Sequence, residues 1–282
     1  MTTFIYILSS LFYGLFEAIL FDGAGMINFL EKISKTNVIS TGYSVYLFSV
    51  IGFIIAIIIM LRNEFKYIIK GYISFFTKSS GAGSERRTSD SDSNSGKRRA
   101  QKNYFPYSLG VLISIIIAIT LSNFVMGYIK ETIEIPFFTG AGFIISALFM
   151  LIFIFANKGN YKADSFMLWI SFPVGIAAGI SPTPGVSCIL IAMTALVLAG
   201  CEVHFAYRYA LLIDIPVMIV SLVNTYKHLM IDFKFSPICI VALIISTVGS
   251  MIGIVFFDKI QETKIIYIFP VISLALGIFM GL

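Results

Sequence analysis

The sequence predicts an all-α integral membrane protein, arranged as an inverted-repeat helical bundle with two interrupted, re-entrant elements. Of its 282 residues 58% are hydrophobic and only 12% are charged, and the mean hydropathy is +0.93. A soluble domain carries roughly 25% charged residues, so this composition excludes an ordinary soluble protein. Apolar runs of membrane-spanning length recur along the whole chain, and two of them contain a break rich in glycine or proline.

Eight apolar runs are expected to form the membrane helices, because a spanning helix needs about 20 apolar residues. The runs cover residues 4–30, 44–61, 107–127, 136–156, 166–200, 209–223, 236–256 and 265–282. The first basic residue is Lys32, so the first run lacks the basic n-region of a signal peptide and is expected to be mature membrane structure. Three parts are predicted: a first membrane repeat (1–78), a polar loop (79–103) and the remaining bundle (104–282).

The basic residues are concentrated between the second and third runs. Residues 62–102 hold ten of the 20 Lys and Arg residues but four of the 15 Asp and Glu residues. Arg62, Lys66 and Lys70 recur every four residues beside apolar ones, which predicts an amphipathic helix on the cytoplasmic headgroups. Residues 79–103 are almost devoid of apolar side chains and are expected to be a disordered cytoplasmic loop. Charge confined to one loop indicates contact with lipid headgroups and predicts no nucleic-acid partner.

The strongest local signal is the stretch Gly175–Leu190, with two prolines and several glycines inside an apolar run. Proline removes a backbone donor, and broken backbone is tolerated in a bilayer only where protein or a water-filled cavity satisfies it. A binding site is therefore expected here. The segment 166–200 either turns back at Ser181–Gly185 or crosses the membrane, and the charges that follow leave both open. Gly14–Gly25 contains a weaker break, and paired breaks indicate a site at a repeat interface.

These breaks resemble one family. The run Gly175–Thr194, followed by Arg208–Val217, is similar to the second half of the bacterial undecaprenyl-diphosphate phosphatases of the BacA type. In that family a glycine-rich helix leads into Pro-Gly-x-Ser-Arg-Ser and then Arg-Phe-Ser-Phe-Leu-Leu-x-Ile-Pro-Val. Gly14-Leu-Phe-Glu17 lies where the family has Gly-Ile-Val-Glu. The resemblance covers essentially the whole chain.

The chain also departs from the family pattern. The second glutamate of the family falls at Phe21, with Asp22 one residue along, and the histidine falls at or near Leu30. In the second motif the arginine position is held by Cys188. This cysteine and the other two are expected to be buried thiols, because their spacing suits neither a disulfide framework nor a zinc site.

The resemblance implies a protein of the bacterial inner membrane that handles a polyprenyl phosphate lipid, with a homodimer and Mg²⁺ or Ca²⁺ as further implications. Hydrolysis of undecaprenyl diphosphate is one hypothesis. The alternatives are binding or translocation of the lipid without hydrolysis, and a small-solute or ion transporter that uses Glu17 and Asp214. The sequence alone leaves the choice open.

Three residues are candidates for catalysis. Glu17 is a carboxylate at membrane depth, which favours metal binding or acid–base chemistry, although an interfacial or protonated carboxyl fits as well. Asp22 replaces the lost glutamate as a second metal ligand, or else caps a helix. Ser187 stands at the start of a half-helix, where free N–H groups attract phosphate, or is a plain capping serine.

Further candidates for substrate binding flank these three. Four of them lie in the second break: Ser181, Thr183, Pro184 and Gly185. The other two, Arg208 and Asp214, follow it in the sequence. Asp214 could bind a cation, relay a proton or hold a neutral hydrogen bond. Its six-residue separation from Arg208 argues against a direct pair on one helix. Arg208 itself fits either a substrate contact or a snorkelling interfacial residue.

Overall fold

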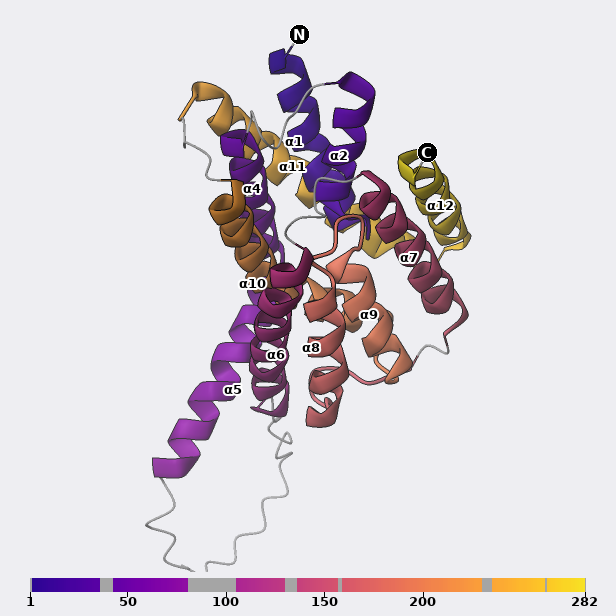
Figure 1. Ribbon diagram of the computed structural model, residues 1–282. Coiled ribbons are helices and arrows are strands. Elements are labelled where there is room, and N and C mark those ends of the chain that lie inside the picture. Colours follow the sequence, from indigo (N-terminus) through magenta and orange to yellow (C-terminus); the bar gives the residue numbers. More distant parts are fainter. Residues whose placement is uncertain are drawn as a thin grey trace, which may run out of the picture.

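The regular structure of the protein is helical, as the sequence predicts. The computed structural model describes residues 2–35, 43–80, 105–129, 136–156, 159–229, 235–261 and 263–281. Within these residues the structure consists of helices, the turns between them and one isolated β-bridge, Tyr161 with Cys201 (Figure 1). The helices are α1 (Thr2–Ala18), α2 (Gly23–Ser34), α4 (Tyr43–Met60), α5 (Arg62–Ser80), α6 (Phe105–Ile129), α7 (Pro136–Phe155), α8 (Ser171–Ile180), α9 (Cys188–Leu198), α10 (Val203–Leu229), α11 (Pro237–Ile260) and α12 (Ile268–Gly281). Two 3₁₀ turns, Leu168–Ile170 and Lys264–Tyr267, precede α8 and α12.

Six of the described helical segments are long and apolar enough to cross a membrane. They are Tyr43–Met60, Phe105–Tyr128, Phe137–Phe155, Val203–Asn224, Pro237–Ile260 and Lys264–Gly281. Large apolar side chains remain exposed along the outside of these helices, as a lipid-facing surface requires. The protein is therefore a multi-pass membrane protein with an all-α fold.

The two interrupted elements form two helical hairpins. Residues 19–22 separate α1 from α2, residues 181–187 separate α8 from α9, and the two helices of each pair pack against each other. The α1–α2 hairpin extends towards the end of the bundle that holds the N-terminus, whereas α8–α9 extends towards the end from which α5 projects (Figure 1). The chain thus turns back at Ser181–Gly185, in the opposite sense to the first hairpin, as expected of an inverted repeat. Entry of the hairpins into a bilayer stays a prediction.

Small residues hold α1 against its neighbour α11. A Cβ atom at Gly14 would lie 2.4 Å from the Ser246 carbonyl oxygen, and one at Gly253 would lie 2.7 Å from the Ala18 Cβ. Such close backbone approach is the usual way in which membrane helices associate, since lipid tails leave no hydrophobic driving force between them. This packing fixes the end of α1, which carries the first candidate residue of the site.

Several boundaries differ from the sequence expectation. Helix α10 begins at Val203 and contains Pro216, so it is longer than the apolar run 209–223. Its first turns include His204 and Arg208, which interrupt the apolar run in the sequence but pair with acidic residues of other helices. The amphipathic segment is helical, and it continues to Ser80, two residues into the predicted loop. The rest of that loop, 81–103, lies outside the described residues.

Candidate functional site

The two helix breaks meet through the side chain of Asp22. Its Oδ2 atom accepts a hydrogen bond from the Gly25 N–H at 2.6 Å and another from the Gly185 N–H at 2.7 Å. The first bond caps α2, because the opening N–H groups of a helix lack partners inside it. The second joins the two hairpins across 163 residues of sequence. Of the two interpretations of Asp22, the structure shows the helix cap, and its role as a metal ligand stays a prediction.

The second break depends on a glycine at position 185. Gly185 has φ +86°, and a Cβ there would lie 2.3 Å from the Thr139 carbonyl oxygen. Its own carbonyl accepts a hydrogen bond from the Ser146 hydroxyl at 2.9 Å, and the Ser187 N–H donates to the same hydroxyl at 3.2 Å. Helix α7 thus supports the broken backbone through the Ser146 hydroxyl.

Replacing Gly185 by alanine is expected to lower the free energy of unfolding by about 2–4 kcal/mol, because a left-handed backbone and a backbone contact both resist the added methyl group. Gly127→Ala is the matched control, since a Cβ at Gly127 meets no other atom within 4 Å. Thermal unfolding of both variants in detergent measures the difference. Equal melting temperatures would show that the second break does not need its present conformation.

Glu17 is buried beside the first break. It is 3% exposed, and its Oε2 atom accepts a hydrogen bond from the Gly23 N–H at 2.6 Å. A Cβ at Gly23 would lie 2.7 Å from this oxygen and 2.8 Å from the Tyr13 ring, so the carboxylate and the ring are neighbours. The position excludes an exposed location for Glu17 and places its carboxylate inside the bundle, next to the meeting point of the breaks.

Asp214 supplies a third carboxyl group to this region from α10. It is 1% exposed, and its Oδ2 atom has no hydrogen-bond partner within the described residues. The Cys188 thiol lies near this carboxyl group and donates a hydrogen bond to the Ala178 carbonyl at 3.9 Å. The charges of Glu17, Asp22 and Asp214 interact with one another, and we call these three residues the acidic cluster. Among the described residues, no Lys, Arg or His appears in the interactions that these carboxyl groups make.

Comparison with known proteins identifies the family of this chain. The family model described as "Bacitracin resistance protein BacA" matches residues 22–279. The chain belongs to the BacA family. A protein named undecaprenyl-diphosphatase 1, from Shouchella clausii, is 24% identical over 232 residues, 80% of this chain and 77% of the relative. Undecaprenyl-diphosphatase 2 of Halalkalibacterium halodurans is 23% identical over 273 residues, 90% of each chain.

The serine and threonine candidates of this BacA-family chain make local hydrogen bonds. Ser187, fully buried, caps α9 by accepting from the Leu190 N–H at 3.3 Å. The Ser181 hydroxyl donates to the Ala178 carbonyl at 2.6 Å, and the Thr183 hydroxyl donates to the Ile180 carbonyl at 3.4 Å. The capping interpretation of Ser187 is therefore observed, whereas its contact with phosphate stays a prediction.

Pro184 also lies at the meeting point, but it acts through its backbone. A Cβ at Gly142 would lie 2.1 Å from the Pro184 carbonyl oxygen, so α7 approaches the break there without a side chain between them. The second break therefore packs against α7 by its backbone on this side, and its Gly185 N–H donates to Asp22 of the acidic cluster.

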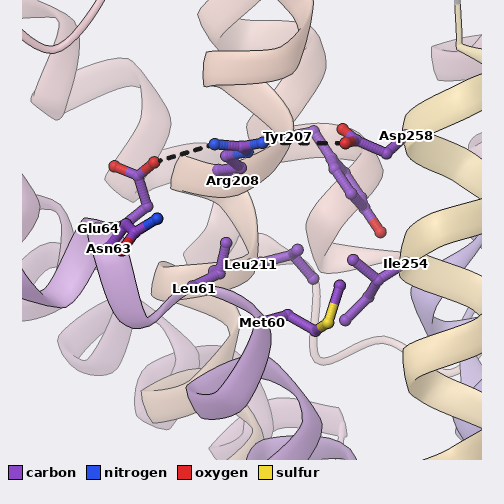
Figure 2. A pocket seen from close by; sticks show the side chains of 9 residues that line it. All are labelled: Met60, Leu61, Asn63, Glu64, Tyr207, Arg208, Leu211, Ile254 and Asp258. Atoms are coloured by element: carbon purple, nitrogen blue, oxygen red, sulfur yellow. Dashed lines mark hydrogen bonds and ion pairs between the residues drawn. The ribbon is translucent and has the colours of Figure 1, made fainter.

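Arg208 lies in a separate pocket, shown in Figure 2, with a cavity volume of about 110 Å³. Its Nη1 atom is 3.3 Å from Glu64 Oε1, and its Nη2 atom is 3.9 Å from Asp258 Oδ2. The lining residues are Met60, Leu61, Asn63, Glu64, Tyr207, Arg208, Leu211, Ile254 and Asp258. Arg208 pairs with neighbouring helices instead of Asp214, as its spacing predicts. Tyr207 connects this pocket to α1, because its hydroxyl donates to the Ala18 carbonyl at 2.7 Å.

Sequence reasoning missed Glu64 and Asp258. Glu64 stands among the basic residues of the amphipathic helix α5. It is 7% exposed, and with Asp258 it joins α5, α10 and α11 through Arg208. Asp258 also lies 3.0 Å from the His204 Nδ1 atom. An acidic residue placed among the basic residues of the amphipathic segment was the sequence signal that could have indicated this pair.

The acidic cluster does not form a complete protein cage for a metal ion. Within the described ranges, no three His, Cys, Asp or Glu side chains are arranged as a set of ligands. Mg²⁺ is usually bound through one or two carboxylates, with waters and phosphate oxygens supplying the other ligands. Hard carboxylate oxygens of Glu17 and Asp22 fit such a partial site, although Asp22 Oδ2 already accepts two N–H groups.

Proposed function

We propose that this protein binds a polyprenyl diphosphate lipid at the acidic cluster in a bacterial cytoplasmic membrane and hydrolyses it to the monophosphate. The observation that carries the proposal is the meeting of two broken helix pairs around a buried glutamate. The N-termini of α2 and α9 lie at the two breaks, and such termini attract phosphate groups. Membership of a family whose curated relatives are named undecaprenyl-diphosphatase supports the choice of lipid.

Hydrolysis of a diphosphate requires positive charge near the transferring phosphoryl group. The arginine of the family motif is absent, since Cys188 holds its position. We therefore assign the positive charge to Mg²⁺ or Ca²⁺, held by Glu17 and Asp22. When bound, such an ion supplies charge neutralisation to the phosphate oxygens.

Glu17 is the group that can move a proton. It is buried, and its Oε2 atom is held by the Gly23 N–H, which leaves its other oxygen to accept a proton from an attacking water. The water oxygen bonds to the terminal phosphorus, the bridging P–O bond breaks, and the products are polyprenyl monophosphate and inorganic phosphate.

A second candidate function is lipid binding or translocation without hydrolysis. The observation that favours it is the local charge, because three carboxyl groups surround the site and Cys188 has replaced the family arginine. The N–H groups of Gly25 and Gly185 already donate to the Asp22 carboxylate, so they are not free to bind a phosphate group. The homodimer that the resemblance implies stays a prediction for either function.

Phosphate release from undecaprenyl diphosphate by the purified protein in detergent, with Mg²⁺ or Ca²⁺, tests the proposal. We expect release that requires the divalent ion and stops when a chelator is added. The control is the same preparation with the lipid monophosphate, which must release no phosphate. Binding of the diphosphate lipid without any release would reject hydrolysis and support the second candidate. Ion flux into vesicles without lipid binding would support a transporter.

A further inference from the structure

Asp214 has a free carboxylate oxygen at the centre of the bundle. It is 1% exposed, and Oδ2 has no hydrogen-bond partner within the described residues. Leaving a buried polar atom unpaired costs about 1–3 kcal/mol, and more when the group is charged. Such an atom therefore indicates either a bound partner or a proton, and its neighbours decide which partner fits.

The neighbours of Asp214 are acidic. Glu17 and Asp22 are close enough for their charges to interact with Asp214. Their own oxygens differ in availability, because one oxygen of Asp22 accepts two backbone N–H groups, whereas Glu17 Oε2 accepts one. Asp214 thus contributes a fully buried oxygen without a hydrogen-bond donor among the described residues.

No basic side chain balances this charge within the described part of the chain. Arg208, six residues before Asp214 in α10, pairs with Glu64 and Asp258 in the separate pocket. Cys188, which lies near Asp214 and donates a hydrogen bond to the Ala178 carbonyl, carries no positive charge. Buried charges in proteins are paired or coordinate metals, so a cation is the partner that this arrangement lacks.

We propose that Asp214 and Glu17 together bind a divalent cation with a preference for oxygen ligands, such as Mg²⁺ or Ca²⁺. This inference rests on the proposed function only in that phosphate oxygens would complete the coordination. Two carboxylates from different helices, α1 and α10, provide hard ligands, and water supplies the remaining oxygens. Asp214 thus adds a carboxylate to the Glu17 and Asp22 of the proposed function, and Asp22, whose Oδ2 already accepts two N–H groups, also links the breaks.

Terbium luminescence measures this site without any lipid. Tb³⁺ replaces Ca²⁺ at oxygen sites, and the Tyr13 ring beside Glu17 can sensitise its emission. We expect the purified wild-type protein to give tyrosine-sensitised emission that excess Ca²⁺ removes. Asp214→Asn and Glu17→Gln should each weaken Tb³⁺ binding by at least about tenfold, because the number of ligand charges sets the affinity of such sites.

Asp258→Asn is the matched control, because Asp258 is an acidic residue on α11 that pairs with Arg208 and His204 outside the acidic cluster. It should bind Tb³⁺ as the wild type does. A second readout is the rise in melting temperature on adding Ca²⁺, which should be present in the wild type and in Asp258→Asn and lost in Asp214→Asn. The elution profile of each variant shows that it is folded.

Three results would overturn the assignment. Asp214→Asn could bind Tb³⁺ as tightly as the wild type, Asp258→Asn could lose binding to the same extent, or Cys188→Ala could abolish it, which would indicate thiolate ligation of a softer metal. Failure of the proposed function is distinguishable, because a protein that releases no phosphate but binds Tb³⁺ through Asp214 keeps the cation site. If the protein releases phosphate but Asp214→Asn binds Tb³⁺ as the wild type does, the proposed function stands and the cation site at Asp214 is rejected.

Discussion

Replacing Glu17 by glutamine is expected to reduce phosphate release from undecaprenyl diphosphate by about 100-fold or more. A positioned general base contributes about 10²–10⁴-fold, and glutamine cannot take the proton of the attacking water. The amide oxygen of glutamine can still accept the Gly23 N–H, so the first break should keep its geometry. Initial rates at saturating lipid and divalent ion measure the effect, with the melting temperature recorded for the same preparations.

Glu64→Gln is the control for this experiment. Glu64 is also a buried glutamate, but it pairs with Arg208 in the separate pocket. We expect this variant to retain phosphate release within a few-fold of the wild type, even where its stability falls. A Glu17→Gln protein that hydrolyses the lipid at the wild-type rate would remove Glu17 from the chemistry and return it to a purely structural position.

Replacing Asp22 by alanine is expected to lower the free energy of unfolding by about 2–5 kcal/mol. Two N–H groups, those of Gly25 and Gly185, lose their acceptor, and hydrogen bonds to a charged group are worth about 1.5–3 kcal/mol each. One of the two bonds joins the hairpins, so the loss should loosen the meeting of the breaks as well as the start of α2. Thermal and denaturant unfolding in detergent measure the change.

Ser187→Ala provides the comparison for Asp22. Ser187 caps α9 through a single local bond to the Leu190 N–H, and loss of such a cap costs about 1 kcal/mol. The difference between the two variants then measures the bond between the hairpins. Should Asp22→Ala cost no more than Ser187→Ala, the Asp22–Gly185 bond contributes little, and packing by α7 alone holds the second break.

Much of the architecture could be predicted because it follows from composition and from local backbone chemistry. Apolar runs must be helical in a membrane, where each backbone group needs a partner within its own segment. The two prolines within Gly175–Leu190 interrupt the helix, and α8 ends before them and α9 begins after them. The resemblance to the BacA family, carried by Pro184–Ser187 and Arg208–Val217, was likewise visible in the sequence and is confirmed by the family model.

The roles of the acidic residues could not be read in the same way. Sequence alone determined the fold class, the family and the two places at which the helices break, because each of these depends on neighbouring residues along the chain. Only the tertiary structure decided that Asp22 links the two breaks, that Arg208 pairs with Glu64 and Asp258, and that Asp214 keeps a free oxygen beside Glu17. Those partners are far apart in the sequence, and hydrogen bonds and charge interactions depend on distances that spacing along the chain does not specify.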